Sequence, residues 1–230
     1  MKSILVLLFG VVLLIITNSG SYDESHSQFK FKPLKITKEE TFGYQDIVAD
    51  SLWLRTVQDL DYCENEKAQK SVNLGSTYQE ALANKNTESR CKMGWVYQML
   101  SVITDLAPRF KKPYTAGAVS LSVGVDDREG ARLIFEKAVK QFPEDWTIAY
   151  AAAYHYLFEI QNATRAADLL LQANRYGGPS WLPVLASRLY TASGRQALGR
   201  SVLEEYLKTH PEGEGAERAR QRLDELNKEK

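Results

Sequence analysis

The chain has few of the residues from which metal sites and nucleophilic active sites are built. Its 230 residues include three His and two Cys, and no His stands at a metal-ligand spacing such as H-E-x-x-H. A glycine-rich phosphate loop and a G-x-S-x-G motif are both missing, and Cys63 has no neighbouring His to activate its thiol. We therefore expect a protein that is not an enzyme and that holds no metal and no cofactor.

An excess of charge of one sign is missing as well. The 29 basic and 29 acidic side chains cancel. A protein that binds nucleic acid neutralises phosphates with surplus Lys and Arg, so we expect no nucleic-acid partner. The length of the chain and its 44% of hydrophobic residues suffice for one domain of ordinary size.

One apolar run, residues 4–16, follows Lys2 near the N-terminus. A transmembrane helix needs about 20 apolar residues, whereas the core of a signal peptide is shorter. Residues 1–20 are therefore predicted to be a signal peptide, with an uncleaved N-terminal membrane anchor as the alternative. Residues 21–45 are mostly polar and are predicted to be a linker.

Two features of this region point to opposite sides of a membrane. Lys2 favours an N-terminus that stays inside and a chain that is exported, to the periplasm or cell envelope if the source is bacterial. Lys30, Lys32, Lys35 and Lys38 beyond the apolar run would instead hold the chain on the cytoplasmic side. We favour export and keep a cytoplasm-facing anchor as the alternative.

The stretch 131–156 has the pattern of two helices joined by a turn. Apolar residues recur at three-to-four spacing before Pro143, which cannot continue a helix. Glu144 and Asp145 then supply carboxylates for the free amides of a new helix that begins near Trp146. Within the first helix, Glu136 and Lys140 are predicted to form an i,i+4 ion pair.

This pattern recurs about every 35 residues along the chain. Four helices carry apolar or small residues at matching positions, and three of them are followed by a proline at the matching place: Val96, Leu100 and Ile103 before Pro108; Ala131, Phe135 and Ala138 before Pro143; Ala166, Leu170 and Ala173; and Gly199, Leu203 and Tyr206 before Pro211. A fixed period of this length indicates a protein built from repeated helix pairs.

Over residues 92–213 the pattern resembles the tetratricopeptide repeat, a pair of antiparallel helices of about 34 residues. The helix that follows each turn corresponds to the first helix of a unit in that family. It also resembles the family, with small residues at Gly117 and Ala118, Ala152 and Ala153, and Ala186 and Ser187. Gly194 stands where the family favours a turn glycine. The resemblance implies an all-α fold in which antiparallel helix pairs stack as a short superhelix, or α-solenoid.

The predicted repeat domain spans residues 46–213, with a first helix over 46–60 and a second over 92–106. A polar insertion, residues 64–90, separates these two helices. Residues 214–230 are predicted to form a helix that caps the stack. Because Cys63 and Cys91 stand at the ends of the insertion, we expect them to form a disulfide in an oxidising compartment, with two buried or free thiols as the alternative.

Three further residues that could suggest chemistry have structural interpretations. Asp126 and Asp127 precede a helix and are expected to cap it rather than to catalyse a reaction. His155 is expected to be a polar residue on the flank of a helix.

The resemblance implies that a partner segment binds on the concave face, which the first helix of each pair lines. Six residues on that face, here called the groove residues, are the predicted contacts: Tyr150, Tyr154, Leu157, Phe158, Trp181 and Arg188. Aromatic residues and Arg are the usual anchors of interfaces, although an aromatic stripe can also fill a core between helices. The lysine and asparagine clamp with which the family binds peptide carboxylates is not recognisable here.

The expected function is a non-enzymatic scaffold for protein–protein interaction, exported or anchored in the membrane. The alternative is a structural subunit of a cell-envelope or secretion assembly that has no ligand in its groove. The sequence does not identify the protein or peptide partner.

Overall fold

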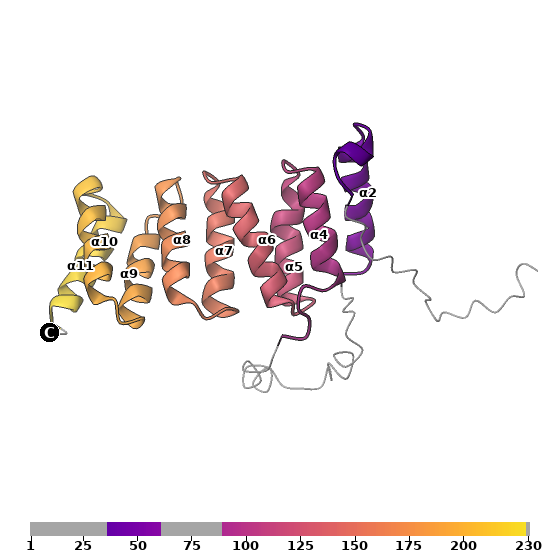
Figure 1. The fold of residues 1–230 in the computed structure, drawn as a ribbon. Helices are drawn as coiled ribbons and strands as arrows, with labels where there is room; N and C mark the ends of the chain where they lie inside the picture. Colours follow the sequence, from indigo (N-terminus) through magenta and orange to yellow (C-terminus); the bar gives the residue numbers. More distant parts are fainter. Residues whose placement is uncertain (1–35, 61–88, 229–230) are drawn as a thin grey trace, which may run out of the picture. The chain divides into compact units, whose positions relative to one another are not determined.

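The computed structural model describes residues 36–60 and 89–228 (Figure 1). Within these residues the fold is all-α, with nine α-helices, two shorter helical turns and no strand. The elements are η1 Glu39–Thr41, α2 Gln45–Gln58, α4 Trp95–Leu106, η4 Pro113–Gly117, α5 Ala118–Val123, α6 Arg128–Gln141, α7 Trp146–Phe158, α8 Ala163–Arg175, α9 Leu182–Ala192, α10 Gln196–Thr209 and α11 Glu214–Lys228.

Helices that follow one another in the chain pack against one another. Helix α4 packs on α2, α6 packs on both α5 and α7, and each helix from α7 to α11 packs on the next one (Figure 1). Short turns reverse the chain between them, as at Gly194, whose φ of +77° is one that glycine adopts without strain. The predicted all-α arrangement of consecutive helix pairs is confirmed.

The residues that recur in the sequence form the core. Ala131, Phe135 and Ala138 of α6 are 0%, 2% and 0% exposed. The matching residues of the other three helices are buried too: Val96, Leu100 and Ile103 of α4, Ala166, Leu170 and Ala173 of α8, and Gly199, Leu203 and Tyr206 of α10. Repetition in the sequence therefore corresponds to repeated burial of one stripe of each of these helices.

Helices α9 and α10 approach each other closely at Gly199. A Cβ atom at this position would lie 2.8 Å from the Ser187 carbonyl oxygen and 2.9 Å from the Thr191 Oγ1. These distances are shorter than van der Waals contact, so a side chain would push the two helices apart. The position admits glycine where the repeat pattern has alanine in α6 and α8.

Three helix starts have side-chain caps, and two of these caps, Asp145 and Asp127, are predicted from the sequence. The Asp145 carboxylate accepts hydrogen bonds from the backbone N–H of Thr147, at 3.0 Å, and of Ile148, at 3.4 Å. Asp127 caps α6, and Asn162 caps α8. These side chains satisfy amide groups that have no partner inside their own helix.

Two local predictions are wrong. Helix α4 begins at Trp95 rather than at residue 92, because Met93 has a left-handed φ of +49° and Gly94 is the N-cap. Glu136 does not pair with Lys140. Its carboxylate instead accepts hydrogen bonds from Arg165 of α8, at 2.9 and 3.0 Å, and from the Tyr156 hydroxyl of α7, at 2.7 Å.

Helix α11 covers 214–228 and buries Ala216, Ala219 and Leu226, while its role as the cap of the helix stack stays a prediction. Several other predictions concern residues outside the described ranges: the signal peptide or anchor at 1–20, the linker up to residue 35, most of the insertion 64–90, and Cys63. Among the described helices none is both long and apolar enough to cross a membrane.

Candidate binding face and polar network

The groove residues lie on α7, on α9 and at Trp181, the N-cap of α9, and all six are at least partly exposed. Tyr154 and Phe158 are 56% and 40% exposed, and Arg188 is exposed as well. They are exposed because the opposite side of α7, which carries Ala149, Ala152 and Ala153, faces the core. The helical period then directs every third or fourth residue away from the core.

The aromatic groove residues make two kinds of contact. The Tyr150 ring meets the Trp181 ring edge to face, with centroids 6.1 Å apart, and the Trp146 ring lies 6.4 Å from the Tyr150 ring. Trp146, Tyr150 and Trp181 are partly buried against the core, so the core-filling interpretation holds for part of their surface. Tyr154 and Phe158, whose centroids are 4.3 Å apart, pair with each other on the exposed side of α7.

Helix α5 also carries exposed apolar side chains. Val119 and Val123 are 46% and 74% exposed. Helix α5 is tied to α7 through the Ser122 hydroxyl and the Nδ1 of His155, which lie 2.9 Å apart. Several large apolar side chains on neighbouring helices are thus left uncovered by the described residues. Uncovered apolar groups of this kind can mark an interaction surface.

Trp181 and Arg188 also line a pocket between α9 and α11. Its volume is about 410 Å³, and Val184 and Leu185 of α9 form its apolar side with Trp181. Helix α11 contributes the charged side, with Arg218, Arg222 and Glu225. Trp181 and Arg188 line the same pocket, and α11 completes it with residues that the sequence pattern does not place beside them.

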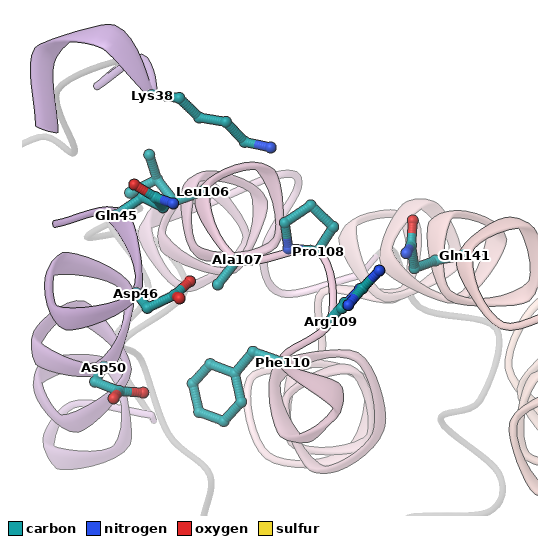
Figure 2. Close-up of a pocket in the computed structure, with 10 residues that line it drawn as sticks. All are labelled: Lys38, Gln45, Asp46, Asp50, Leu106, Ala107, Pro108, Arg109, Phe110 and Gln141. Carbon is teal, nitrogen blue, oxygen red and sulfur yellow. The ribbon is translucent and has the colours of Figure 1, made fainter. Parts of the chain in front are cut away.

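A second pocket, of about 540 Å³, lies between the start of α2 and the connection that follows α4 (Figure 2). The carboxylates of Asp46 and Asp50, one helical turn apart on α2, line one wall, and Phe110 lies across from them. Lys38 and Arg109 add positive charge to its rim. No motif in the sequence predicts this pocket, because its walls come from segments about 60 residues apart.

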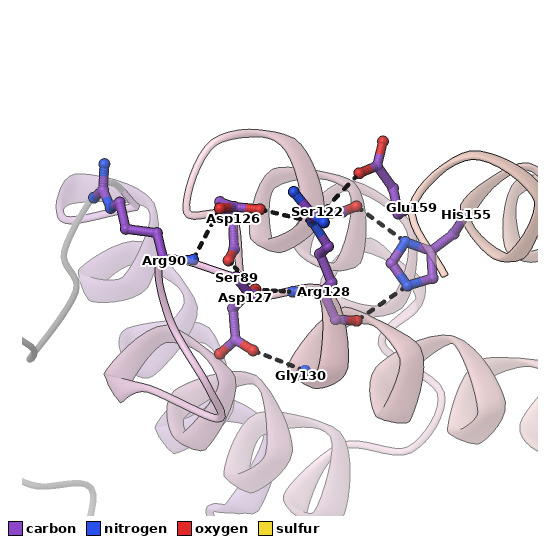
Figure 3. A network of polar contacts seen from close by, with 9 residues as sticks. All are labelled: Ser89, Arg90, Ser122, Asp126, Asp127, Arg128, Gly130, His155 and Glu159. Carbon is purple, nitrogen blue, oxygen red and sulfur yellow. Dashed lines mark hydrogen bonds and ion pairs between the residues drawn. The ribbon is translucent and has the colours of Figure 1, made fainter. Parts of the chain in front are cut away.

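A polar network surrounds the start of α6 (Figure 3). It includes the residues just before α4, which follow the insertion in the chain. Asp127 is fully buried, and its carboxylate accepts hydrogen bonds from three backbone amides: Gly130 at 2.8 Å, Met93 at 3.0 Å and Gly94 at 2.9 Å. One carboxylate therefore caps α6 and also holds the chain at the start of α4.

Neighbouring residues extend the network. The backbone N–H of Arg90 donates to the Asp126 carboxylate at 2.8 Å, and the Arg128 guanidinium donates to the same carboxylate at 2.9 Å. The backbone N–H of Arg128 donates to the Ser89 hydroxyl at 3.1 Å. The capping role predicted for Asp126 and Asp127 is confirmed for Asp127, and Asp126 joins the network as a second acceptor.

His155 is buried rather than placed on a helix flank. Its side chain is 4% exposed, and its Nε2 lies 3.1 Å from the Arg128 carbonyl oxygen while its Nδ1 contacts Ser122 (Figure 3). Burial, which disfavours the charged ring, lowers the pKa of His155 to about 4. The neutral ring thus joins α5, α6 and α7 through two hydrogen bonds, and a substrate would have no access to the buried Ser122 hydroxyl in this conformation.

Cys91 is buried at 1% exposure, just ahead of α4, and its backbone N–H donates to the Asp126 carbonyl oxygen at 3.2 Å. Cys63 lies outside the described residues, so the Cys63–Cys91 pairing stays a prediction. Within the described ranges, no group of three or more His, Cys, Asp and Glu side chains is placed to hold a metal ion.

Comparison with known proteins adds no assignment. No family model matches the chain, and no curated protein and no solved structure matches it.

Proposed function

We propose that this protein is a non-enzymatic scaffold that binds a segment of a protein partner over the exposed sides of α7 and α9. The observation that carries the proposal is the exposed pair Tyr154 and Phe158, which adjoins the partly buried Tyr150 and Trp181 on one face. Large aromatic side chains with both a fixed buried part and an accessible part are typical anchors of interfaces.

The resemblance to the tetratricopeptide repeat supports the same mode of action, because stacked helix pairs of that family bind partner segments on the concave face. The predicted signal peptide or anchor supports a place in the cell envelope, either exported or bound to the membrane. A structural subunit of an envelope or secretion assembly is the alternative, in which the same face would be covered permanently by other subunits.

A photo-crosslinking experiment in cells tests the proposal. A photoreactive phenylalanine analogue at position 154 should capture a discrete protein, whereas the same analogue at Tyr176, which is 40% exposed on the turn after α8, should not. The captured protein is then purified, and its affinity for the native chain is measured.

The variant Tyr154→Ala/Phe158→Ala should bind the purified partner at least about tenfold more weakly, since each residue removes an exposed aromatic contact. Its helical circular dichroism should stay unchanged because neither side chain belongs to the buried core. Tyr176→Ala is the matched control and should keep full affinity. Equal affinity of all three proteins would show that the binding face is wrong.

A further inference from the structure

The pocket between α9 and α11 combines an apolar wall with a positive one. Its volume of about 410 Å³ lies in the range of pockets that bind ligands, roughly 300 to 1,000 Å³. Trp181 and Leu185 are partly buried there and pack against the core, so their positions do not depend on a ligand. The apolar wall can therefore receive a side chain without rearrangement of α9.

The charge of the lining residues contrasts with that of the whole chain. Three arginines, Arg188, Arg218 and Arg222, face one carboxylate, Glu225, which leaves two positive charges in excess in a chain whose net charge is zero. Arg222 pairs with Glu225 at 2.8 Å, and Arg218 pairs with Glu214 one turn earlier on α11.

Arg188 differs from the two arginines of α11. It is an exposed lining residue whose charge helps to lower the pKa of Glu225, but no carboxylate of the described residues lies within ion-pair distance of it. A guanidinium group presents several N–H donors in one plane, which match the two oxygens of a carboxylate. An incoming carboxylate could bind Arg188 without displacing an existing ion pair.

We propose that this pocket binds an acidic segment of the partner, in which a carboxylate binds Arg188 and a neighbouring apolar side chain packs on Trp181. The proposal rests on the proposed function, because the Trp181 ring meets Tyr150 edge to face and so continues the binding face of α7. A nucleic acid is disfavoured as the occupant, since the chain as a whole has no excess of positive charge. Helix α11 thus has a role in recognition besides covering the end of the helix stack.

Selection from a random peptide library tests the proposal without knowledge of the partner. The full chain, purified in a mild detergent, is used as bait, and the enriched peptides should combine Asp or Glu with an adjacent apolar residue. The most enriched peptide is then synthesised, together with a counterpart in which glutamine and asparagine replace its acidic residues. The acidic peptide should bind, and its amide counterpart should bind at least about tenfold more weakly.

Charge reversal locates the contact. Arg188→Glu should weaken binding of the acidic peptide at least about tenfold, and Arg188→Gln should weaken it less, because the first adds repulsion to the loss of the ion pair. Arg175→Glu is the matched control: it makes the same charge change at an exposed position at the end of α8, away from the pocket, and should leave affinity within about twofold.

The outcomes separate this proposal from the proposed function. Enriched peptides without acidic residues, or equal affinity of the native chain and Arg188→Glu, would overturn the assignment of the pocket. If either result is found but Tyr154→Ala/Phe158→Ala still weakens binding of the enriched peptide, the binding face on α7 stands without the acidic pocket. A selection that enriches no peptide would count against both.

Discussion

His155 is held neutral by its surroundings. Its ring is 4% exposed and lies between the Ser122 hydroxyl and the Arg128 carbonyl oxygen. Burial is the main cause that lowers its pKa from 6.5 to about 4, and the hydrogen bond to the Arg128 carbonyl oxygen opposes this shift in part. The folded protein therefore binds fewer protons than the unfolded chain in the pH range between these two values.

This difference predicts how stability changes with pH. The contribution of His155 is fully present above about pH 6.5 and is lost as the pH falls toward 4, because the unfolded chain then takes up the proton first. Between about pH 7.5 and pH 5 the native protein should lose at most about 2 kcal/mol of unfolding free energy from this residue. Urea denaturation at both pH values measures the loss.

The variant His155→Gln is the control, because glutamine can form hydrogen bonds but does not titrate. It should be less stable than the native protein at neutral pH, yet its own loss between the two pH values should be smaller by that amount. If the native protein and the variant lose the same free energy between the two pH values, His155 does not have the lowered pKa.

At the scale of single elements, Gly199 sets the distance between α9 and α10. The variant Gly199→Ala would place a methyl group 2.8 Å from the Ser187 carbonyl oxygen, which belongs to the backbone and cannot rotate away. We expect the variant to lose about 1–3 kcal/mol of stability through overpacking. Helix propensity alone predicts the opposite sign, since alanine normally stabilises a helix relative to glycine by up to about 1 kcal/mol.

Thermal unfolding followed by circular dichroism shows whether Gly199→Ala loses or gains stability. Ser201→Ala, an exposed change in the same helix, should leave stability within about 0.5 kcal/mol. A gain of stability in Gly199→Ala would mean that α9 and α10 are not in close contact at this point.

Helices α6 and α4 show what sequence patterns can and cannot predict about single elements. Burial at Ala131, Phe135 and Ala138 follows from a period that lies within one helix, and it was predicted correctly. The start of α4 is not predicted correctly, because the backbone amides of Met93 and Gly94 are hydrogen-bonded to Asp127, more than 30 residues later in the chain. Local spacing contains no information about such a partner.

The proposed binding face could be predicted from local spacing, whereas the ion pairs between helices and the pockets could not. Tyr150, Tyr154 and Phe158 are spaced along one helix, so their common exposed side could be predicted from their positions alone. Whether Glu136 pairs with Lys140 or with Arg165 depends instead on how α6 and α8 approach each other. The arginines that α11 adds to the pocket with Trp181 depend on packing in the same way.

At the scale of the whole molecule, the network around Asp126 and Asp127 fixes one end of the insertion. The backbone groups of Arg90, Cys91, Met93 and Gly94 are all hydrogen-bonded to these two residues, so the chain returns to the helix stack at a defined place. Cys91 is held there in a buried position. A buried cysteine in a fixed position is suited to a structural disulfide bond, and its predicted partner is Cys63 at the other end of the insertion.

We expect a Cys63–Cys91 disulfide if the chain is exported. Alkylation of thiols in intact cells, followed by mass measurement without reductant, should then find neither cysteine modified. In the entropy model the bond restricts the unfolded chain by roughly 3 kcal/mol, so a reductant should lower the urea midpoint of the native protein. Cys63→Ser/Cys91→Ser is the control and should not respond to reductant. Two alkylated thiols in intact cells would instead favour the cytoplasm-facing anchor, because a reducing compartment keeps cysteines as thiols.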